Sequence, residues 1–199
     1  MFKKIIWLSA IIIQCSTSVV TAQSAKWTVD TMHTSVKFLA SHLGVSLIAG
    51  QFTKFEGSMI ADKTDFTNAK IDFVVQIKSV NTNVPMRDDD LRSANFFDAD
   101  KYPEMVFKSI SFKKLTAKNY LLSGNLTIKD VTKRVTFKVI ANPIIKDPWG
   151  NTRTGFHAAL TINRFDFHIN QKEKFDNNKL QIAAEINILI DTEFTKDKL

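Results

Sequence analysis

Hydrophobic and polar residues alternate with a period of two along most of the chain, which places successive side chains on opposite faces of β-strands. The alternation is longest at 180–191, and shorter runs lie at 70–78, 120–129 and 135–139. A run as long as 180–191 exceeds an ordinary globular strand and is typical of a barrel.

Less regular alternation predicts four further strands, at 25–40, 50–61, 105–113 and 154–167. Clusters of turn-forming residues separate the strands, and these clusters predict turns at 62–65, 115–119, 129–133 and 147–151. Connections as short as these join antiparallel neighbours.

Two segments are predicted to be helical. Residues 86–97 begin with an acidic turn and end in two phenylalanines, and Pro103 prevents the helix from continuing. A second, short helical turn is expected at 41–47. Seven or eight antiparallel strands with one or two short helices fit either a closed barrel or a sandwich, and alternation alone does not distinguish the two.

The N-terminal residues have the layout of a cleaved secretory signal peptide. Two lysines precede an apolar run that ends at Ile13, and small residues lie just before a cleavage site after Ala22. We therefore expect residues 1–22 to be removed on export to the periplasm and residues 23–199 to form one domain. The only cysteine, Cys15, leaves with the signal peptide, so burial must stabilise the exported domain without disulfides.

The formal net charge is +7. Such a surplus favours transient contact with an anionic membrane surface or ligand head group, and it is also what an ordinary basic soluble protein shows. The basic residues are scattered and form no dense block with stacking aromatics, so nucleic acid is not an expected partner.

Five short motifs occur in order along the mature chain. They are 27–38 (WTVDTMHTSVKF), 50–57 (GQFTKFEG), the SVNT, RD, FFD and KYP elements of 79–107, 124–133 (GNLTIKDVTK), and 155–167 with its GF and NRFDF. As an ordered set over roughly residues 25–191, they resemble the YceI-like family.

The resemblance implies an all-β fold, a closed antiparallel lipocalin-like eight-stranded β-barrel with one or two short helices. It also implies a periplasmic binding or carrier protein, not an enzyme, whose ligand is a long apolar lipid such as a polyisoprenoid or an isoprenoid quinone held inside the barrel. No catalytic residue, no metal and no cofactor besides this lipid is expected.

Three positions depart from the family pattern. Asp130 and Arg134 stand where a hairpin glycine and proline are expected, which changes the turn type. His168 stands where glycine is more frequent, which affects how the backbone approaches that end of the pocket.

Six of the 16 phenylalanines are expected on the apolar face, where they would line the barrel and hold the lipid tail. They are Phe38, Phe52, Phe73, Phe107, Phe137 and Phe156. Each CH₂ buried among them contributes about 0.8 kcal/mol. From the residues alone, the same side chains could instead fill the barrel and leave no cavity.

Polar candidates for the ligand head group are His33, Arg153 and Arg164, since arginine presents a fork of donors. The histidines show no metal-binding spacing, and no nucleophile motif is present. The acidic start of 86–97 is expected to cap the helix.

Two alternatives to a lipid carrier remain open from the sequence. One is an envelope stress or interaction protein with a packed barrel and no lipid ligand. The other is an enzyme acting on a lipid, which would need a polar cluster around His33 or Arg153. A homodimer is compatible with an exported barrel, although no diagnostic patch marks one.

Overall fold

The computed structural model describes residues 24–171 and 180–198. The predicted signal peptide, residues 1–22, lies outside the described residues. The first strands are β1 (Ala25–Val29), β2 (Ser35–His42), β3 (Ser46–Phe52), β4 (Phe55–Ala61), β5 (Lys70–Gln76) and β6 (Val80–Asn81), with the 3-10 helix η1 (Ile77–Ser79) between the last two. Helix α1 (Pro85–Arg92) is followed by β7 (Glu104–Lys114), β8 (Asn119–Ile128), β9 (Val131–Ala141), β10 (Ile145–Lys146), β11 (Thr152–Asn163), the 3-10 helix η2 (Arg164–Phe167) and β12 (Ile182–Lys196).

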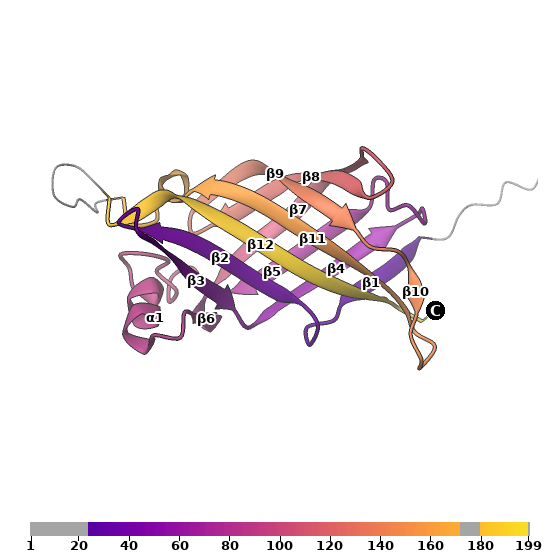
Figure 1. The fold of residues 1–199 in the computed structure, drawn as a ribbon, viewed down its shortest axis with the longest axis horizontal. Coiled ribbons are helices and arrows are strands. Elements are labelled where there is room, and N and C mark those ends of the chain that lie inside the picture. The colour runs from indigo at the N-terminus through magenta and orange to yellow at the C-terminus, as the bar shows by residue number, and fades with distance from the viewer. Residues whose placement is uncertain (1–23, 172–179, 199) are drawn as a thin grey trace, which may run out of the picture.

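All these strands belong to one antiparallel sheet, which closes on itself through the pairing of β11 with β12 (Figure 1). Some barrel strands are interrupted and therefore carry two labels. Thus β1 and β2 together form one barrel strand, because both pair with the same edge of β12, β1 at 194–196 and β2 at 182–191. In the same way, β3 and β4 together form the next barrel strand, because β3 pairs with β2 and β4 pairs with β1. The strand after that consists of β5, which pairs with β4, and β6, which pairs with β3. The ring therefore has eight strands, which confirms the expected barrel and excludes the sandwich.

The longest predicted strand, 180–191, corresponds to β12, which spans 15 residues. Its side chains alternate between exposed positions and half-buried positions such as Ile186, Ile188 and Ile190. These isoleucines face the barrel interior, where they line cavities and do not pack completely. The period of two thus marks the inside and outside of the barrel, as expected.

Three phenylalanine rings lie against glycines of a neighbouring strand on the barrel wall. The pairs are Phe38 with Gly50, Phe73 with Gly57, and Phe107 with Gly124. A Cβ atom at any of these glycines would collide with the ring, so the missing side chain lets each ring lie flat on the sheet.

Loop 62–69 closes one end of the barrel. Phe66 in this loop is buried, and its ring packs edge-on against Trp27 and Phe156 at centroid distances of 5.6 and 5.3 Å. The hydroxyl of Tyr120 donates to the carbonyl of Asp65 at 2.8 Å and holds the loop in place. The opposite end carries α1 and the turn between β2 and β3 (Figure 1).

Both helix predictions need correction. The predicted helix 86–97 ends at Arg92, because the following residues fold back in turns and the ring of Phe97 packs against Phe52 at 5.9 Å. The predicted helical turn at 41–47 is wrong, since these residues form the β2–β3 hairpin. Leu43 and Gly44 both have positive φ there, as a tight hairpin turn requires.

Three predicted strands are interrupted or shortened. The strand at 25–40 breaks at residues 30–34, where the carboxylate of Asp30 accepts the Met32 N–H and turns the chain. The strand at 50–61 breaks between Phe52 and Phe55, and the one at 154–167 ends at Asn163, whose side chain starts η2. Among the described helices, none is long and apolar enough to cross a membrane.

Candidate functional site

A cavity of about 750 Å³ lies inside the barrel at the end that carries α1. A narrower cavity of about 110 Å³ lies deeper, between the walls made by β5, β7, β8, β9, β11 and β12. Val36, Met105, Ile128 and Ile188 line both, so the two are consecutive parts of one lumen. The larger part has the size of typical small-molecule sites, roughly 300–1,000 Å³.

The six phenylalanines that the sequence singles out all face this lumen. Phe38 and Phe52 line the larger cavity, whereas the narrower one is lined by Phe73, Phe107, Phe137 and Phe156. Their rings pack in pairs, such as Phe107 with Phe137 at 5.4 Å, and this fixes the shape of the deep part. The barrel is therefore narrow and aromatic at depth and wider near α1.

Helix α1 is fastened beside the cavity by a buried carboxylate. Asp88 accepts the backbone N–H and the hydroxyl of Thr82 at 2.8 and 2.6 Å. The Arg87 guanidinium donates to the hydroxyl and carbonyl oxygens of the same threonine at 2.7 and 2.8 Å. Asp88 thus ties the helix to the segment before it instead of capping the first turn, while Thr82 and Arg87 also line the cavity.

Arg164 is buried in the wall of the larger cavity and joins η2 to the start of β12. Its side chain donates to the carbonyl oxygens of Ala183 and Ile182 in β12 and of Ile169 and Asn170 after η2, at 3.0–3.1 Å. Its guanidinium also stacks over the ring of Phe165 at 4.3 Å. Through these contacts with described residues, Arg164 stabilises the cavity wall.

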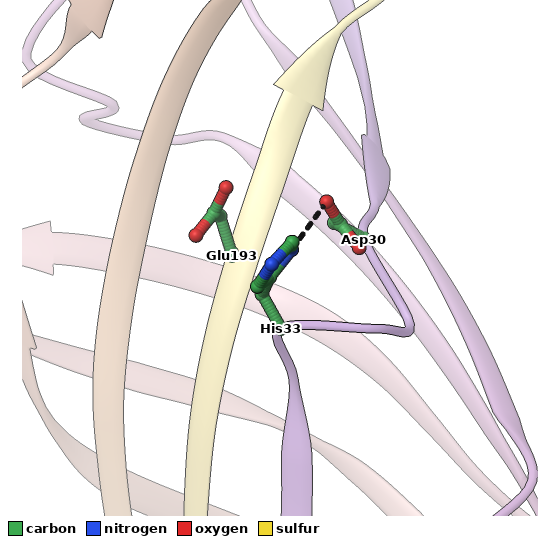
Figure 2. Close-up of side chains that lie close together, drawn as sticks. All are labelled: Asp30, His33 and Glu193. Atoms are coloured by element: carbon green, nitrogen blue, oxygen red, sulfur yellow. Dashed lines mark hydrogen bonds and ion pairs between the residues drawn. The ribbon is translucent and has the colours of Figure 1, made fainter. Parts of the chain in front are cut away.

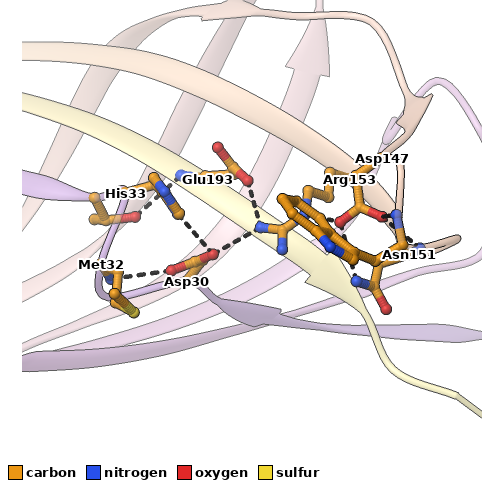
Figure 3. A network of polar contacts seen from close by, with 9 residues as sticks. Asp30, Met32, His33, Asp147, Asn151, Arg153 and Glu193 are labelled. Atoms are coloured by element: carbon orange, nitrogen blue, oxygen red, sulfur yellow. Dashed lines mark hydrogen bonds and ion pairs between the residues drawn. The ribbon is translucent and has the colours of Figure 1, made fainter.

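Arg153 and His33 belong to a polar network at the other end of β12 (Figure 3). The Arg153 guanidinium pairs with Asp30 at 2.7 Å, with Asp147 at 2.6 Å and with Glu193 at 2.5 Å. Neither His33 nor Arg153 lines either cavity. The network joins the β1–β2 turn, β11 and β12.

Asp30, His33 and Glu193 place potential metal-ligand atoms within 4.8 Å of one another (Figure 2). The Arg153 guanidinium, however, already pairs with both carboxylates and supplies the positive charge that a cation would bring. His33 donates to Asp30 at 2.9 Å, and this hydrogen bond raises the pKa of the imidazole. The arrangement is therefore satisfied as an ion-pair network, and it needs no metal to explain it.

The network depresses the pKa of two carboxyl groups. Burial alone would raise the pKa of Asp30, but hydrogen bonds from His33, Arg153 and the Met32 N–H outweigh it and lower the pKa to about 2. For Asp147, burial is likewise outweighed by hydrogen bonds from Asn151, Arg153 and Trp149, and its pKa also falls to about 2.

Stability should consequently fall in acid. Both folded-state pKa values lie below the ordinary 3.8, so the unfolded chain binds more protons between about pH 4 and pH 2. The contribution of these groups is present above pH 4 and is lost as the pH falls toward 2. Urea unfolding from pH 6 to pH 2 measures it, and Asp147→Asn should flatten the profile in this window. An unchanged profile in this variant would contradict the assignment.

Comparisons with known proteins agree with the barrel fold. The family described as YceI-like domain matches residues 27–194. This chain belongs to the YceI-like family. A UPF0312 protein of Pseudomonas putida is 39% identical over 150 residues, which cover 74% of this chain and 78% of that protein.

Two solved structures show the same fold. The YceI protein of Campylobacter jejuni superposes with a TM-score of 0.69 at 28% identity, over 79% of this chain and 90% of that one. A polyisoprenoid binding domain from Saccharophagus degradans superposes with a TM-score of 0.66 at 13% identity, over 86% of this chain and 98% of that one.

Two departures of this YceI-like chain from the family pattern meet at the cavity rim. His168 has a φ of 55°, a left-handed conformation that glycine adopts more readily than histidine, which fits the glycine expected at this position. Its ring lies 3.2 Å from the carboxylate of Asp130. Beside them, the Lys129 ammonium donates to the carbonyls of Phe96 and His168 at 2.9 and 3.1 Å. The β8–β9 turn therefore clamps the segment after α1 to the end of η2.

The sequence-based site is thus divided by the structure. Seven of its nine residues, the six phenylalanines and Arg164, lie at the cavities, whereas His33 and Arg153 lie in the distant network. Sequence reasoning missed Leu91, Phe96 and Phe97, which cover the wide cavity. The available signal was the pair of phenylalanines at the end of the segment that carries three aspartates near its start.

Proposed function

We propose that this YceI-like protein binds and carries a long apolar lipid of the isoprenoid class, a polyisoprenoid or an isoprenoid quinone, with its tail inside the barrel. The observation that carries the proposal is the shape of the lumen, a cavity of about 750 Å³ that continues into a narrow channel lined by phenylalanines. The polyisoprenoid binding reported in the name of the Saccharophagus degradans domain, which shares the fold, supports the ligand class.

The physical basis is the burial of a chain-like apolar molecule. Each CH₂ group contributes about 0.8 kcal/mol, so a tail that extends from the wide cavity into the narrow one gains several kcal/mol. Part of this gain offsets the loss of translational freedom and of rotamer freedom on binding. An elongated lumen that narrows to a closed end favours a single long tail over a compact ligand.

The polar end of the ligand belongs at the α1 side in this proposal. Thr82, Arg87, Asp90 and Asn95 line the wide cavity there and offer donors and acceptors. The deep cavity is lined almost entirely by apolar side chains, with Thr192 the polar exception. A head group placed in the deep part would lose its hydrogen bonds to water, which favours the orientation with the tail inward.

Binding without catalysis fits the distribution of polar groups. The cluster around His33 and Arg153, which an enzyme acting on the lipid would need, lies outside the cavity walls. The signal-peptide layout of residues 1–22 supports export, and we propose that the carrier works in the periplasm.

Native mass spectrometry of the protein purified from its own periplasm without detergent tests the proposal. We expect one discrete added mass that is extracted by organic solvent and identified as an isoprenoid lipid. A protein that retains only its own mass under mild conditions, and takes up no added quinone or polyprenol, would contradict it. That result would favour an interaction protein whose partner binds the outer surface.

A further inference from the structure

Three exposed aliphatic side chains occupy the turn between β2 and β3. Leu43 is 45% exposed, Val45 86% and Leu47 65%. A turn of this kind is normally built from Asn, Asp or Gly, which water solvates well. Leu43 also has a positive φ of 53°, a backbone conformation that is unfavourable for a residue with a bulky side chain.

This turn, which we call the β2–β3 tip (residues 43–47), stands at the rim of the wide cavity. The residues on either side of it, His42 and Ile48, both line that cavity. Across the cavity, α1 contributes Met86, which is 83% exposed and lines the same cavity. Figure 1 shows the tip and α1 at the same end of the barrel. The cavity is therefore flanked on two sides by apolar side chains that face water.

The tip carries no charge that would oppose entry into lipid. No Asp, Glu, Lys or Arg occurs between Lys37 and Lys54. Without Lys3 and Lys4 of the predicted signal peptide, 25 Lys and Arg stand against 20 Asp and Glu, and the resulting net charge of +5 attracts the exported domain to an anionic bilayer. Exposed aliphatic residues on an uncharged loop, combined with a positive net charge, are the features of surfaces that insert shallowly into a membrane interface.

A second exposed apolar patch, at the opposite end of the barrel, provides a contrast. Ile145 and Trp149 are 54% and 80% exposed there. They lie next to the Arg153 network: Ile145 pairs with Arg153 across β10 and β11, and the backbone N–H of Trp149 donates to the carboxylate of Asp147 at 3.0 Å. Docking through this patch would leave the wide cavity at the far end of the barrel, because neither cavity is lined by these two residues.

We infer that the β2–β3 tip forms a membrane-docking surface, by which the protein rests one side of its cavity rim on an anionic lipid bilayer. Met86 on α1 is not part of this surface, because the carboxylates of Asp89 and Asp90 are exposed beside it. Docked in this way, the cavity faces the membrane, and an apolar ligand passes between bilayer and barrel without crossing open water. The purpose of docking rests on the proposed lipid carriage. The surface itself is identified from side-chain exposure and charge and does not depend on that proposal.

Flotation of the exported protein with vesicles of phosphatidylethanolamine and phosphatidylglycerol tests the surface. We expect wild-type protein to float with these vesicles, and less so at high salt, because salt screens the attraction. Val45→Asp/Leu47→Asp should reduce the bound fraction by about tenfold or more, since it places two charges where aliphatic groups are buried in lipid. Val45→Ser/Leu47→Ser should give a smaller loss in the same direction.

The matched control is Ile144→Asp/Ile145→Asp at the opposite end, where the two isoleucines are 37% and 54% exposed. It makes the same change of charge at exposed aliphatic residues. It should float like the wild type. Equal loss in both double variants would show that net charge alone governs binding and would overturn the docking surface. Absence of wild-type flotation, or flotation unaffected by the tip variant, would overturn it as well. So would a wild-type dimer that only the tip variant dissociates, because the tip would then bind a second copy.

Lipid extraction from the same variants separates this inference from the proposed function. A tip variant that loses flotation but keeps its bound lipid leaves lipid carriage intact and supports docking. A wild-type protein that floats but yields no lipid retains the docking surface and contradicts lipid carriage.

Discussion

Replacing Gly124 by alanine should lower the free energy of unfolding by about 3 kcal/mol, the upper part of the usual range for overpacking. The new Cβ would lie 2.5 Å from the carbonyl oxygen of Lys108 and would also collide with the ring of Phe107. Gly124 lies opposite Ser109, next to an irregularity in the β7 register, which brings the backbones unusually close. A backbone carbonyl within the sheet cannot move aside as a side chain can.

Urea unfolding followed by circular dichroism measures this loss. Gly50→Ala is the control, because the three atoms nearest to its Cβ would all belong to the far end of the Phe38 ring, which borders the wide cavity and can shift. It should cost clearly less than Gly124→Ala. In addition, Phe107→Leu combined with Gly124→Ala should recover little stability. Similar losses at the two glycines, or full recovery in the double variant, would show that ring clashes rather than the carbonyl set the cost.

Replacing Ala40 by phenylalanine should reduce the amount of bound lipid by about tenfold or more. Ala40 is buried in β2 and lines the wide cavity, so the added ring would occupy space that the ligand needs. A bound lipid that loses several buried CH₂ contacts, at about 0.8 kcal/mol each, loses affinity by at least this factor. Lipid per protein after extraction, together with uptake of added quinone, measures the effect.

Ala49→Phe provides the matched control for this variant. Ala49 pairs with Leu39 in the adjacent register position, is exposed, and belongs to the outer face of β3. The same substitution there adds the same ring without entering the lumen, and lipid content should stay at the wild-type level. Thermal unfolding of both variants verifies that they fold. Unchanged lipid content in a folded Ala40→Phe protein would place the ligand elsewhere.

Most strand positions, and the side chains that point inward from them, were predictable without a structure. Alternation predicted β5, β7 and β8 almost to their ends and most of β12, which continues five residues beyond the predicted 191, because the side-chain direction in a strand is a local property. It also put the six phenylalanines on the inner face. The ordered motifs pointed to the family, and through it to a closed barrel, which alternation could not distinguish from a sandwich.

Local patterns were least informative where the chain bends to meet other segments. The predicted helix 86–97 was too long, because the contact of Phe97 with Phe52 joins residues far apart in sequence. The hairpin at 41–47 was mistaken for a helical turn, since its turn contains Leu43 at a positive φ rather than a residue that signals one. In both cases tertiary packing overrode local preference.

Only the tertiary structure decided which polar residues share a site. Both Arg153 and Arg164 are arginines near an end of β11, and nothing in the sequence distinguished them. In the closed barrel, Arg153 lies in a carboxylate network and Arg164 lies in the cavity wall. Closure also fixed the volume of the lumen, which depends on how eight strands tilt and pack around it. The number of phenylalanines follows from the composition. That they leave a cavity beside α1 is visible only in their three-dimensional arrangement.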